Sequence, residues 1–401
     1  MSEQKNNTPN LRFPAFTGEW EEKKLGEVCE VKRGVRVTRR DLKEDGKYPV
    51  FQNTDKPLGF YDFSNVKANN PFVIIGGSAG LIGFCKTDFW AADDCVTFGD
   101  SDTINKYFLY STLLLHNMGI KNFVRGGNIP RIERVALERL QISFPSPAEQ
   151  QKIASCLSAM DDLIAAQAEK VEALKEKKTG LMQQLFPQPG ETTPRLRFPE
   201  FKGEWEVKNL GEVCDSILVG FPFKREDITD DASGHPILRA FSIGEGIIRH
   251  GKDYDKYYPY DAEKLKKYEV RKGDIVISMD GSVGKNIAMV SEKEERNLLI
   301  QRVARLRITN YPIHLIFQQI ISQRFKDYAA GEKKGAVIAH ISQKQIELFP
   351  IYVPDSPAEQ EKIASCLSTL DDQIAAETEK LTALKDYKKG LMQQLFPQPA
   401  K

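Results

Sequence analysis

The chain has 401 residues, 41% of them hydrophobic and 28% charged, a composition typical of a globular protein with two or three domains. Its 57 basic and 56 acidic residues leave a formal net charge of +1, which excludes a bulk polycation. No apolar run approaches the ~20 residues of a membrane span. Residues 1–10 are too polar for a secretory signal, and six cysteines without a C-x-x-C spacing predict neither a metal cage nor a disulfide framework. We therefore expect a soluble, cytoplasmic protein.

Two blocks of the sequence occur twice. Residues 11–31 recur as 196–216 with 15 of 21 positions identical, and residues 146–189 recur as 356–399 with 33 of 44 identical. The intervening segments share little beyond pattern, so one constant frame carries two different inserts. The predicted parts are a first domain at 1–145 (variable part 32–145), a long helix at 146–189, a second domain at 190–355 (variable part 217–355) and a second long helix at 356–401.

The first variable segment has the pattern of a mixed, strand-rich domain. Short apolar runs bounded by Gly, Asp and Asn predict strands. The strands are expected at Phe72–Ile75, Cys95–Phe98 and Leu140–Pro145, and a helix near Ile104–Met118. Sixteen basic and twelve acidic residues give the segment a net charge of +4, a modest excess that an ordinary solvated surface would also show.

Two clusters in this segment are candidate DNA contacts. Five cations surround Gly34 within residues 32–40, and guanidinium groups suit phosphates and guanine edges. Farther along, arginines and an asparagine flank a Gly pair, which lets backbone N–H groups approach phosphate. The candidates are Lys32, Arg33, Arg36, Arg39, Arg40, Arg125, Asn128 and Arg131. A solvated loop and an ordinary turn are the competing interpretations.

Each long constant block predicts one long helix. Ser146 and Ser356, followed by Pro and then by Glu149 and Glu359, resemble a capping box, and Phe-Pro-Gln-Pro ends each helix. Apolar residues alternate at spacings of three and four, the heptad repeat of a coiled coil. The first seam is Ile153, Leu157, Met160, Ile164, Val171, Leu174, Leu181 and Leu185; the second is Ile363, Leu367, Leu370, Ile374, Leu381, Leu384, Leu391 and Leu395; the polar seam positions are Gln167, Lys178, Glu377 and Lys388.

These seams admit two interpretations. From Ile153 to Leu185 the first helix would be roughly 50 Å long at ~1.5 Å per residue. Two amphipathic helices packed on separate globular cores would show a similar pattern. The matched lengths and matched seams favour the two helices packing on each other.

The second variable segment repeats the mixed pattern with different residues. Strands are expected at Asp274–Met279, Ile287–Val290, Val303–Ile308 and Phe349–Pro354, and a helix near Pro312–Ala330. Its net charge is +3, whereas the two long helices carry −1 and −2. Candidate DNA contacts are Lys224, Arg225, Gln301, Arg302, Arg305, Lys333, Lys334 and His340, although basic residues on strands often mark only the solvated face. We expect one fold that carries two different surfaces.

Three motifs resemble enzyme sites and do not complete them. Asn69-Asn-Pro-Phe72 lacks one proline of the loop that grips adenine in amino-methyltransferases. Residues 279–286 end like a phosphate loop without its first Gly or its Ser/Thr. Residues 76–83 do not match the dinucleotide-binding spacing and favour a tight turn between strands. We predict no catalytic, cofactor or metal residues in this chain.

The repeated blocks also carry a family resemblance. The duplicated Leu-Arg-Phe-Pro-x-Phe-x-Gly-Glu-Trp opening and the Pro-Ala-Glu-Gln-x-Lys-Ile blocks at 147–153 and 357–363 resemble the DNA-specificity subunit of type I restriction–modification systems. The resemblance covers essentially the full chain. It implies an α+β fold in which two target-recognition domains are joined by an antiparallel coiled coil of two long helices.

The resemblance also implies partners. Each domain would read one half of a split site on double-stranded DNA, and the chain itself would be non-catalytic. Two modification subunits, which bind S-adenosylmethionine and methylate adenine N6, would dock on the frame, and restriction subunits using ATP and magnesium would join through them. A near-exact repeat suits two copies of one partner, and rigid helices would fix the spacing between half-sites.

Other functions stay open from the sequence. A self-contained adenine methyltransferase would need a cofactor-binding motif, which we do not find. A coiled-coil scaffold without DNA readout would not need basic, Gly-rich loops in both inserts. A specificity subunit of a methyltransferase-only complex has the same sequence features as one that works with a nuclease.

Overall fold

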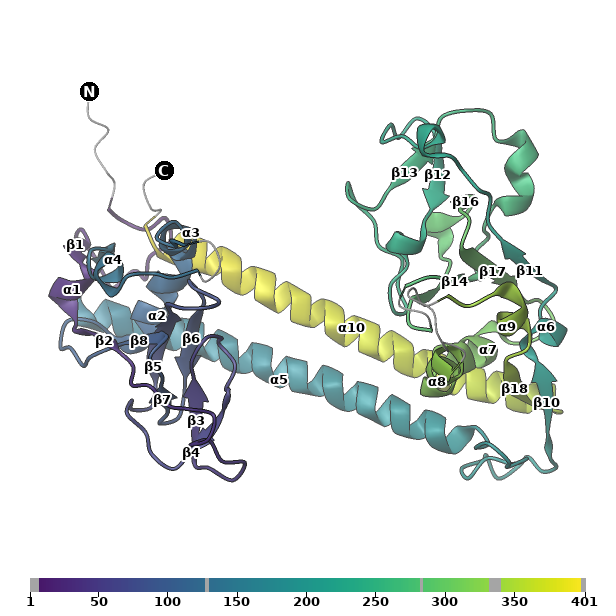
Figure 1. Ribbon diagram of the computed structural model, residues 1–401, viewed down its shortest axis with the longest axis horizontal. Coiled ribbons are helices and arrows are strands. Elements are labelled where there is room, and N and C mark those ends of the chain that lie inside the picture. The colour runs from purple at the N-terminus through teal and green to yellow at the C-terminus, as the bar shows by residue number, and fades with distance from the viewer. Residues whose placement is uncertain (1–6, 127–129, 282–283, 332–339, 398–401) are drawn as a thin grey trace. The chain divides into compact units, whose positions relative to one another are not determined.

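The computed structural model describes residues 7–126, 130–281, 284–331 and 340–397. The chain forms two compact units, Met1–Glu169 with Thr378–Lys401 (unit 1) and Lys170–Glu377 (unit 2). Each unit therefore contains one globular domain, the first part of one long helix and the last part of the other (Figure 1). No helix among these described residues combines the length and the apolar character of a membrane span.

The described part of unit 1 contains three sheets. In the first, β1 (Glu21–Lys24) pairs antiparallel with β9 (Gln141–Phe144). The second has the order β2-β8-β5-β6, with antiparallel neighbours, and the third the order β4-β3-β7, with β3 and β7 parallel. The other strands are β2 (Val31–Arg33), β3 (Tyr48–Phe51), β4 (Gly59–Tyr61), β5 (Asn70–Ile74), β6 (Ile82–Cys85), β7 (Trp90–Ala91) and β8 (Cys95–Phe98), and the short helices are α1 (Leu25–Val28), α2 (Lys106–Leu115), α3 (Asn117–Lys121) and α4 (Arg134–Glu138).

Unit 2 repeats this arrangement strand for strand. Strand β10 (Trp205–Asn209) pairs antiparallel with β18 (Pro350–Pro354), and the other sheets have the orders β11-β17-β14-β15 and β13-β12-β16, with β12 and β16 parallel. The remaining elements are β11 (Ser216–Val219), β12 (His235–Leu238), β13 (Lys256–Tyr258), β14 (Ile275–Ser278), β15 (Ile287–Met289), β16 (Leu298–Leu299), β17 (Val303–Arg307), α6 (Leu210–Val213), α7 (Ile313–Ile320), α8 (Gln323–Gly331), α9 (Gln343–Glu347) and the 3-10 turns η1 (Arg225–Asp227), η2 (Ala240–Ser242), η3 (Glu263–Tyr268) and η4 (Glu292–Glu294).

The expectation of one fold with two surfaces is confirmed, and the predicted strands match β5, β8, β9, β14, β15, β17 and β18 within two residues at each end. Each predicted helix of the variable segments is instead interrupted: the one near Ile104–Met118 is α2 followed by the start of α3, and Pro312–Ala330 is α7 and α8. The Ser322 hydroxyl donates to the Gln319 carbonyl (2.6 Å), a side-chain bond that competes with the helical pattern where α7 ends.

The two constant blocks form α5 (Pro147–Leu185) and α10 (Pro357–Leu395), each of 39 residues and about 58 Å long at ~1.5 Å per residue. Every seam residue is buried or half-buried. In unit 2 the helices run antiparallel, because Lys170 contacts Glu377 and the later Lys178 contacts the earlier Asp371, both at 2.5 Å.

Both polar lysines of the seam bind an aspartate of the other helix within their own unit. Lys178 pairs with Asp371 in unit 2, and its repeat equivalent Lys388 pairs with Asp161 in unit 1. Each aspartate also accepts a hydrogen bond from its globular domain, Asp371 from the Gln318 amide and Asp161 from the Tyr107 hydroxyl. These aspartates therefore join both helices to the domain.

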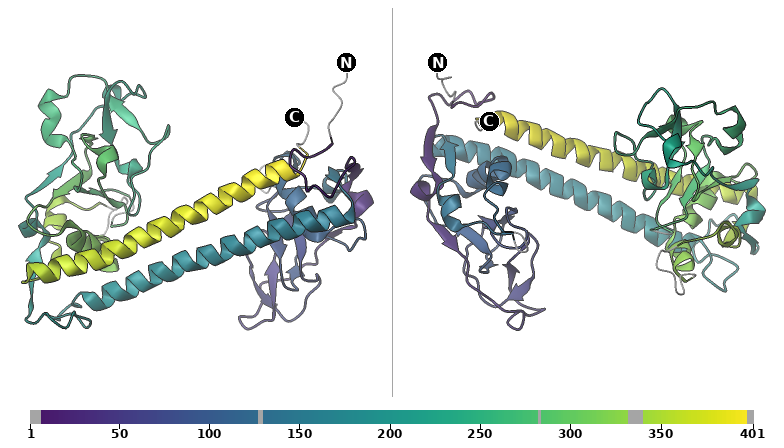
Figure 2. Two further views of the ribbon diagram at one scale, coloured as in Figure 1. Left: turned by 180° about the vertical axis from the view of Figure 1, so that it is seen from behind. Right: turned by 45° about the horizontal axis from the view of Figure 1, so that its top comes forward.

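The helix ends lie inside the globular cores. Ile153 and Leu157 at the start of α5 share one buried cluster with Leu395 and Phe396 at the end of α10, and the ring of Phe396 stacks on Phe108 at 5.1 Å. Figures 1 and 2 show the last turns of α10 beside α2 and the start of α5. In unit 2, Ile363, Leu367, Leu185 and Phe186 share the equivalent core. The ends of both long helices therefore pack on the globular cores, as the interpretation with separate globular cores expects.

The expected capping arrangement is confirmed in part: the Glu359 N–H donates to the Ser356 hydroxyl (3.4 Å), but the carboxylates of Glu149 and Glu359 bind arginines. The buried Glu149 carboxylate accepts two hydrogen bonds from Arg12, at 2.8 and 2.7 Å, and Glu359 accepts two from Arg197, at 2.7 and 2.8 Å. These arginines belong to the Leu-Arg-Phe-Pro openings, so each opening is fastened to the helix of its own domain. A bidentate arginine–carboxylate pair offers more directed charge compensation than a cap at this buried position.

Candidate nucleic-acid interface

In both domains, the residue that follows a central strand is hydrogen-bonded through its backbone to two other segments of the chain. After β5, the Ile75 N–H donates to the Asp94 carbonyl (2.7 Å), and the Ile75 carbonyl accepts from the Ile132 N–H (2.9 Å). After β14, Met279 makes the same two bonds with Arg302 and Ile341, each at 2.9 Å. We call the three backbone segments that these bonds join the crossing. It makes Gly76 and Asp280, Asp94 and Arg302, and Arg131 and His340 equivalent positions.

The side chains at the crossing differ between the domains. In unit 1, Arg131 lies 4.0 Å from the Asp94 carboxylate. In unit 2, the Asp280 carboxylate accepts from Arg302 Nη1 (2.7 Å) and bonds His340 Nδ1 (2.6 Å). Desolvation raises the pKa of Asp280, but the hydrogen bonds from His340 and Arg302 outweigh it and leave the pKa below its ordinary value. One frame therefore presents two different sets of hydrogen-bonding groups.

The turn after the crossing accounts for two of the enzyme-like motifs. Gly77 and Gly80 have φ angles of +78° and +92°, and Gly281 and Gly284 have +76° and +79°, values that favour glycine. Strands β5 and β6, and β14 and β15, pair antiparallel on either side of this turn. The predicted tight turn at 76–83 is confirmed. Residues 282 and 283 lie outside the described residues.

The basic segment of residues 32–40 begins in β2, which contains Lys32 and Arg33, and continues as a loop. Lys32 pairs with Glu30 (2.9 Å), and Arg33 Nε donates to the Asp93 carbonyl (2.7 Å), one residue from the crossing. Arg36, Arg39 and Arg40 are exposed, and within the described residues they form no ion pair. A Cβ at Gly34 would lie 2.1 Å from the Ala92 carbonyl oxygen, so this glycine is required for the close approach of the loop to β7.

The second domain repeats the loop with fewer cations. A Cβ at Gly220 would lie 2.2 Å from the Ile300 carbonyl oxygen. The Lys224 N–H donates to the Asp227 carboxylate (3.1 Å), as the Thr38 N–H donates to Asp41 (2.8 Å). Lys224 and Arg225 are exposed and occupy the places of Thr38 and Arg39.

The structure thus gathers part of the predicted set around the crossing. Arg125 and Arg131 bond each other's backbone, the Arg33 side chain reaches the adjacent turn, and Gln301 and Arg302 lie together with His340. These residues are exposed, and their contacts with DNA stay predictions. Asn128, Lys333 and Lys334 lie outside the described residues.

Arg305 is a correction. Its side chain is 5% exposed and donates to the Lys267 and Glu269 carbonyls at 3.2 and 3.0 Å. Strand β17 lies between β11 and β14, and both of its faces are covered, by one core that contains Ala304 and another that contains Val303. An alternating strand pattern does not reveal that the second face is covered. Arg305 is a structural residue.

Sequence reasoning also missed an aromatic cluster in the second domain. The ring of Phe241, 61% exposed, stacks on Tyr254 at 5.3 Å, and the guanidinium of Arg249 lies 5.9 Å from the Tyr254 ring. Phe241 lies in η2, which begins two residues after β12, and the last residue of β12 pairs with Leu299 just before the crossing. No spacing in the sequence marks this cluster, because the loop that joins its members is irregular.

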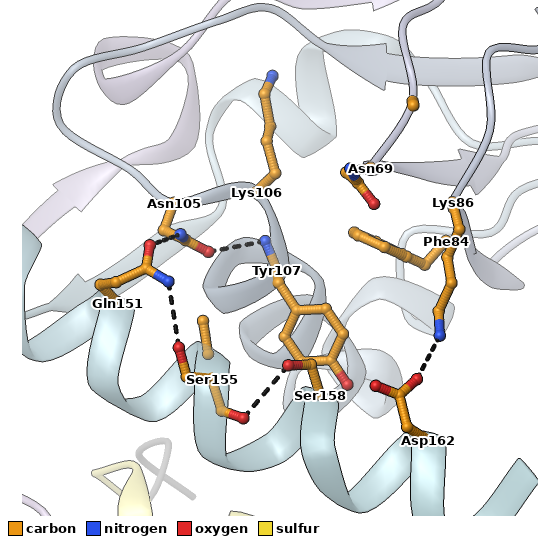
Figure 3. A pocket seen from close by; sticks show the side chains of 12 residues that line it. Asn69, Phe84, Lys86, Asn105, Lys106, Tyr107, Gln151, Ser155, Ser158 and Asp162 are labelled. Atoms are coloured by element: carbon orange, nitrogen blue, oxygen red, sulfur yellow. Dashed lines mark hydrogen bonds and ion pairs between the residues drawn. The ribbon is translucent and has the colours of Figure 1, made fainter. Parts of the chain in front are cut away.

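An open cavity of about 580 Å³ lies between the first domain and α5 (Figure 3). Its polar groups largely bind one another: Asn105 bonds Gln151 at 2.9 Å and Lys86 pairs with Asp162 at 2.6 Å. Asn69 lines the cavity, but the next residue, Asn70, is buried and donates to the Phe98 carbonyl (3.2 Å). These contacts join the first domain to α5 beside the cavity, and Asn70 of the Asn-Asn-Pro-Phe segment is held inside the domain.

Comparison with known proteins matches this arrangement. The family described as "Type I restriction modification DNA specificity domain" matches residues 17–176 and 202–386. The chain belongs to this family of type I specificity subunits. The two matched ranges correspond to the two halves of the internal repeat, so each half is one copy of the specificity domain.

Individual relatives extend over nearly the whole chain. The type I restriction enzyme MjaVIII specificity subunit of Methanocaldococcus jannaschii is 24% identical over 96% of this chain and 93% of its own length. The crystal structure of a type I restriction–modification S subunit from M. genitalium has a TM-score of 0.68 at 20% identity, covering 98% of this chain and 100% of that one. A chain from a study of complex assembly and conformational transition of the type I system has a TM-score of 0.50 at 17% identity, covering 94% and 97%. These likenesses establish the specificity-subunit fold.

Proposed function

We propose that this chain reads a split DNA site for a type I restriction–modification complex, with one domain on each half of the site. The observation that carries the proposal is the crossing: two domains with the same strand order and the same backbone bonds hold different side chains at equivalent positions. Side chains that differ on a shared frame suit two half-sites of different sequence, because base edges are read by side-chain donors and acceptors.

The constant parts support docking of two identical partners. The Arg12–Glu149 and Arg197–Glu359 pairs, and the Lys388–Asp161 and Lys178–Asp371 pairs, have the same geometry in the two units. A repeated frame presents repeated faces, as two copies of one subunit require. We propose two adenine-methylating modification subunits as these partners, with restriction subunits joining through them.

The chemistry of the complex belongs to those partners in this proposal. S-adenosylmethionine, ATP and magnesium would be bound by the modification and restriction subunits, and this chain would contribute recognition and spacing. In the described residues, no group of three or more His, Cys, Asp or Glu side chains is arranged to hold a metal ion. The long helices would set the gap between the half-sites, and an intracellular location would follow from the work on DNA.

Co-production with the modification subunits of its own system, in a host without adenine methylation, tests the proposal. Mapping of modified adenines should give a split motif with two unlike halves. Exchange of residues 32–145 for the same segment of another specificity subunit should then change one half only. A stable complex that modifies no adenine would favour a scaffold without DNA readout.

A further inference from the structure

Arg302 occupies an unusual position at the crossing of the second domain. Its backbone has a φ of +63°, in the left-handed region that costs energy for a side chain of this size. Its side chain is 66% exposed, whereas its partner Asp280 is 23% exposed. An ion pair this exposed contributes little to stability, so the pair does not offset the strained backbone by strengthening the fold. Backbone strain of this kind is often found at functional sites.

The geometry leaves most of the guanidinium available. Nη1 of Arg302 donates to Asp280 Oδ2 at 2.7 Å, which orients the planar group. The other N–H donors keep the forked arrangement that binds O6 and N7 of guanine in the major groove. Asp280 is itself held from its other oxygen by His340 Nδ1 at 2.6 Å, so the carboxylate positions Arg302 from a fixed place.

The equivalent position in the first domain carries the opposite charge. Asp94 stands in the place of Arg302, and its nearby cation Arg131 comes from the place of His340, at 4.0 Å. A shared structural role at this position would not tolerate such a reversal. A role in reading two different half-sites would explain it.

We propose that Arg302 is a specificity-determining residue that reads a guanine in the half-site bound by the second domain, and that Asp280 is its positioning residue. This inference rests on the proposed function, because it requires that the second domain reads DNA. The loss of one bidentate contact with guanine corresponds to a loss of discrimination of roughly 5- to 150-fold at one base position.

The test is the methylation motif of the full complex, made with Arg302→Ala, Arg302→Lys and Asp280→Asn. Arg302→Ala should relax one guanine of the motif to any base, in the half that changes when residues 217–355 are exchanged. Arg302→Lys should also relax it, because lysine lacks the fork. Asp280→Asn should relax the same position less, because the arginine remains but loses its charged anchor.

Arg296 provides a matched control. It is an exposed arginine of the same domain with a φ of +68°, and its backbone N–H bonds the Val270 carbonyl away from the crossing. Arg296→Ala should leave the motif unchanged.

Three results would overturn the inference. The first is an unchanged motif with Arg302→Ala, and the second is an equal loss of methylation at every site without relaxation, which would indicate a phosphate contact. The third is relaxation in the half read by the first domain. A wild-type complex that methylates no split motif would instead overturn the proposed function, and this inference with it.

Discussion

The Arg12–Glu149 and Arg197–Glu359 pairs, which attach the two openings to the long helices, should contribute equally to the stability of their units. Replacing Arg12 by alanine removes two hydrogen bonds of 2.7 and 2.8 Å from Glu149, whose side chain is 2% exposed. It also removes the bond from Arg12 to the Thr17 carbonyl (3.2 Å). The opening then loses its attachment to α5, and a carboxylate stays buried without its cation.

The cost follows from burial. Breaking a buried ion pair from one side costs about 3–5 kcal/mol, and the 18% exposure of Arg12 places this pair at the lower end. A loss of about 3 kcal/mol corresponds to roughly 6–12 °C in the melting temperature of a unit of about 200 residues. Arg197→Ala should cost the same, because the side chains of Arg197 and Glu359 are 17% and 1% exposed and have the same two bonds.

Hydrogen exchange measured by mass spectrometry, together with thermal melting, locates the effect. Arg12→Ala should raise exchange in residues 11–31 and leave residues 196–216 unchanged, and Arg197→Ala should do the reverse. Arg195→Ala is the control, since Arg195 and its partner Glu191 are 68% and 35% exposed and such a pair contributes under about 1 kcal/mol. If Arg12→Ala and Arg195→Ala melt alike, the anchoring role of the buried pair is refuted.

Three further predictions concern the helices and the basic loop. Asp161→Ala should lower the free energy of unfolding in urea by about 2 kcal/mol, because Lys388 and Tyr107 lose their acceptor. The control Asp162→Ala removes only an exposed pair with Lys86 and should cost about 0.5 kcal/mol or less. Equal costs would contradict the role of Asp161 in joining the helices to the domain. Alanine at Arg36, Arg39 and Arg40 together should lower the slope of log K against log salt by up to about 2.7 without changing the motif, if these residues contact phosphates; an unchanged slope would place the loop away from DNA. Insertion of one heptad into each long helix should lengthen the gap between half-sites by about three base pairs. Seven helical residues add about 10 Å, and DNA rises about 3.4 Å per base pair. A gap equal to that of the wild type would contradict the spacing role of the helices.

Local patterns predicted most of the fold. The heptad spacing from Ile153 to Leu185 depends on neighbours along one helix, and it predicted both long helices. Each begins within one residue of the predicted start, whereas α5 and α10 end at Leu185 and Leu395, before the predicted bounds of 189 and 401. The strands of the variable segments followed in the same way from apolar runs bounded by turn residues. These signals are contained in short windows of sequence, where side-chain periodicity determines which face is buried.

Contacts between distant parts of the chain were not predictable from such windows. Arg12 and Glu149 are 137 residues apart, and the available signal was that both halves of the repeat keep this arginine and this glutamate. Asp161 had no visible partner because Tyr107 and Lys388 come from a different domain element and a different helix. Arg305 was misplaced because the burial of both faces of β17, by two different cores, is a property of the whole domain.

The chemistry of the candidate site could be predicted from the sequence, but only some of its residues could. Arg131, Arg302 and His340 were chosen for their chemistry. The crossing places Arg131 and His340 at equivalent positions, and Arg302 and His340 bind the same carboxylate, that of Asp280. Asp94 and Asp280 were not chosen, because an acid is an unexpected neighbour for DNA until it is seen to orient an arginine. The partners of a base-reading side chain thus emerge from the fold, whereas its donor groups can be recognised in the sequence.

In the proposed function, each domain reads one half of a split site. The most direct test maps modified adenines for the wild-type complex and for a complex in which residues 32–145 come from another specificity subunit. We predict two motifs that share one half and differ in the other, with the gap conserved. Two motifs that differ in both halves, or the same motif from both complexes, would contradict the division of recognition between the two domains.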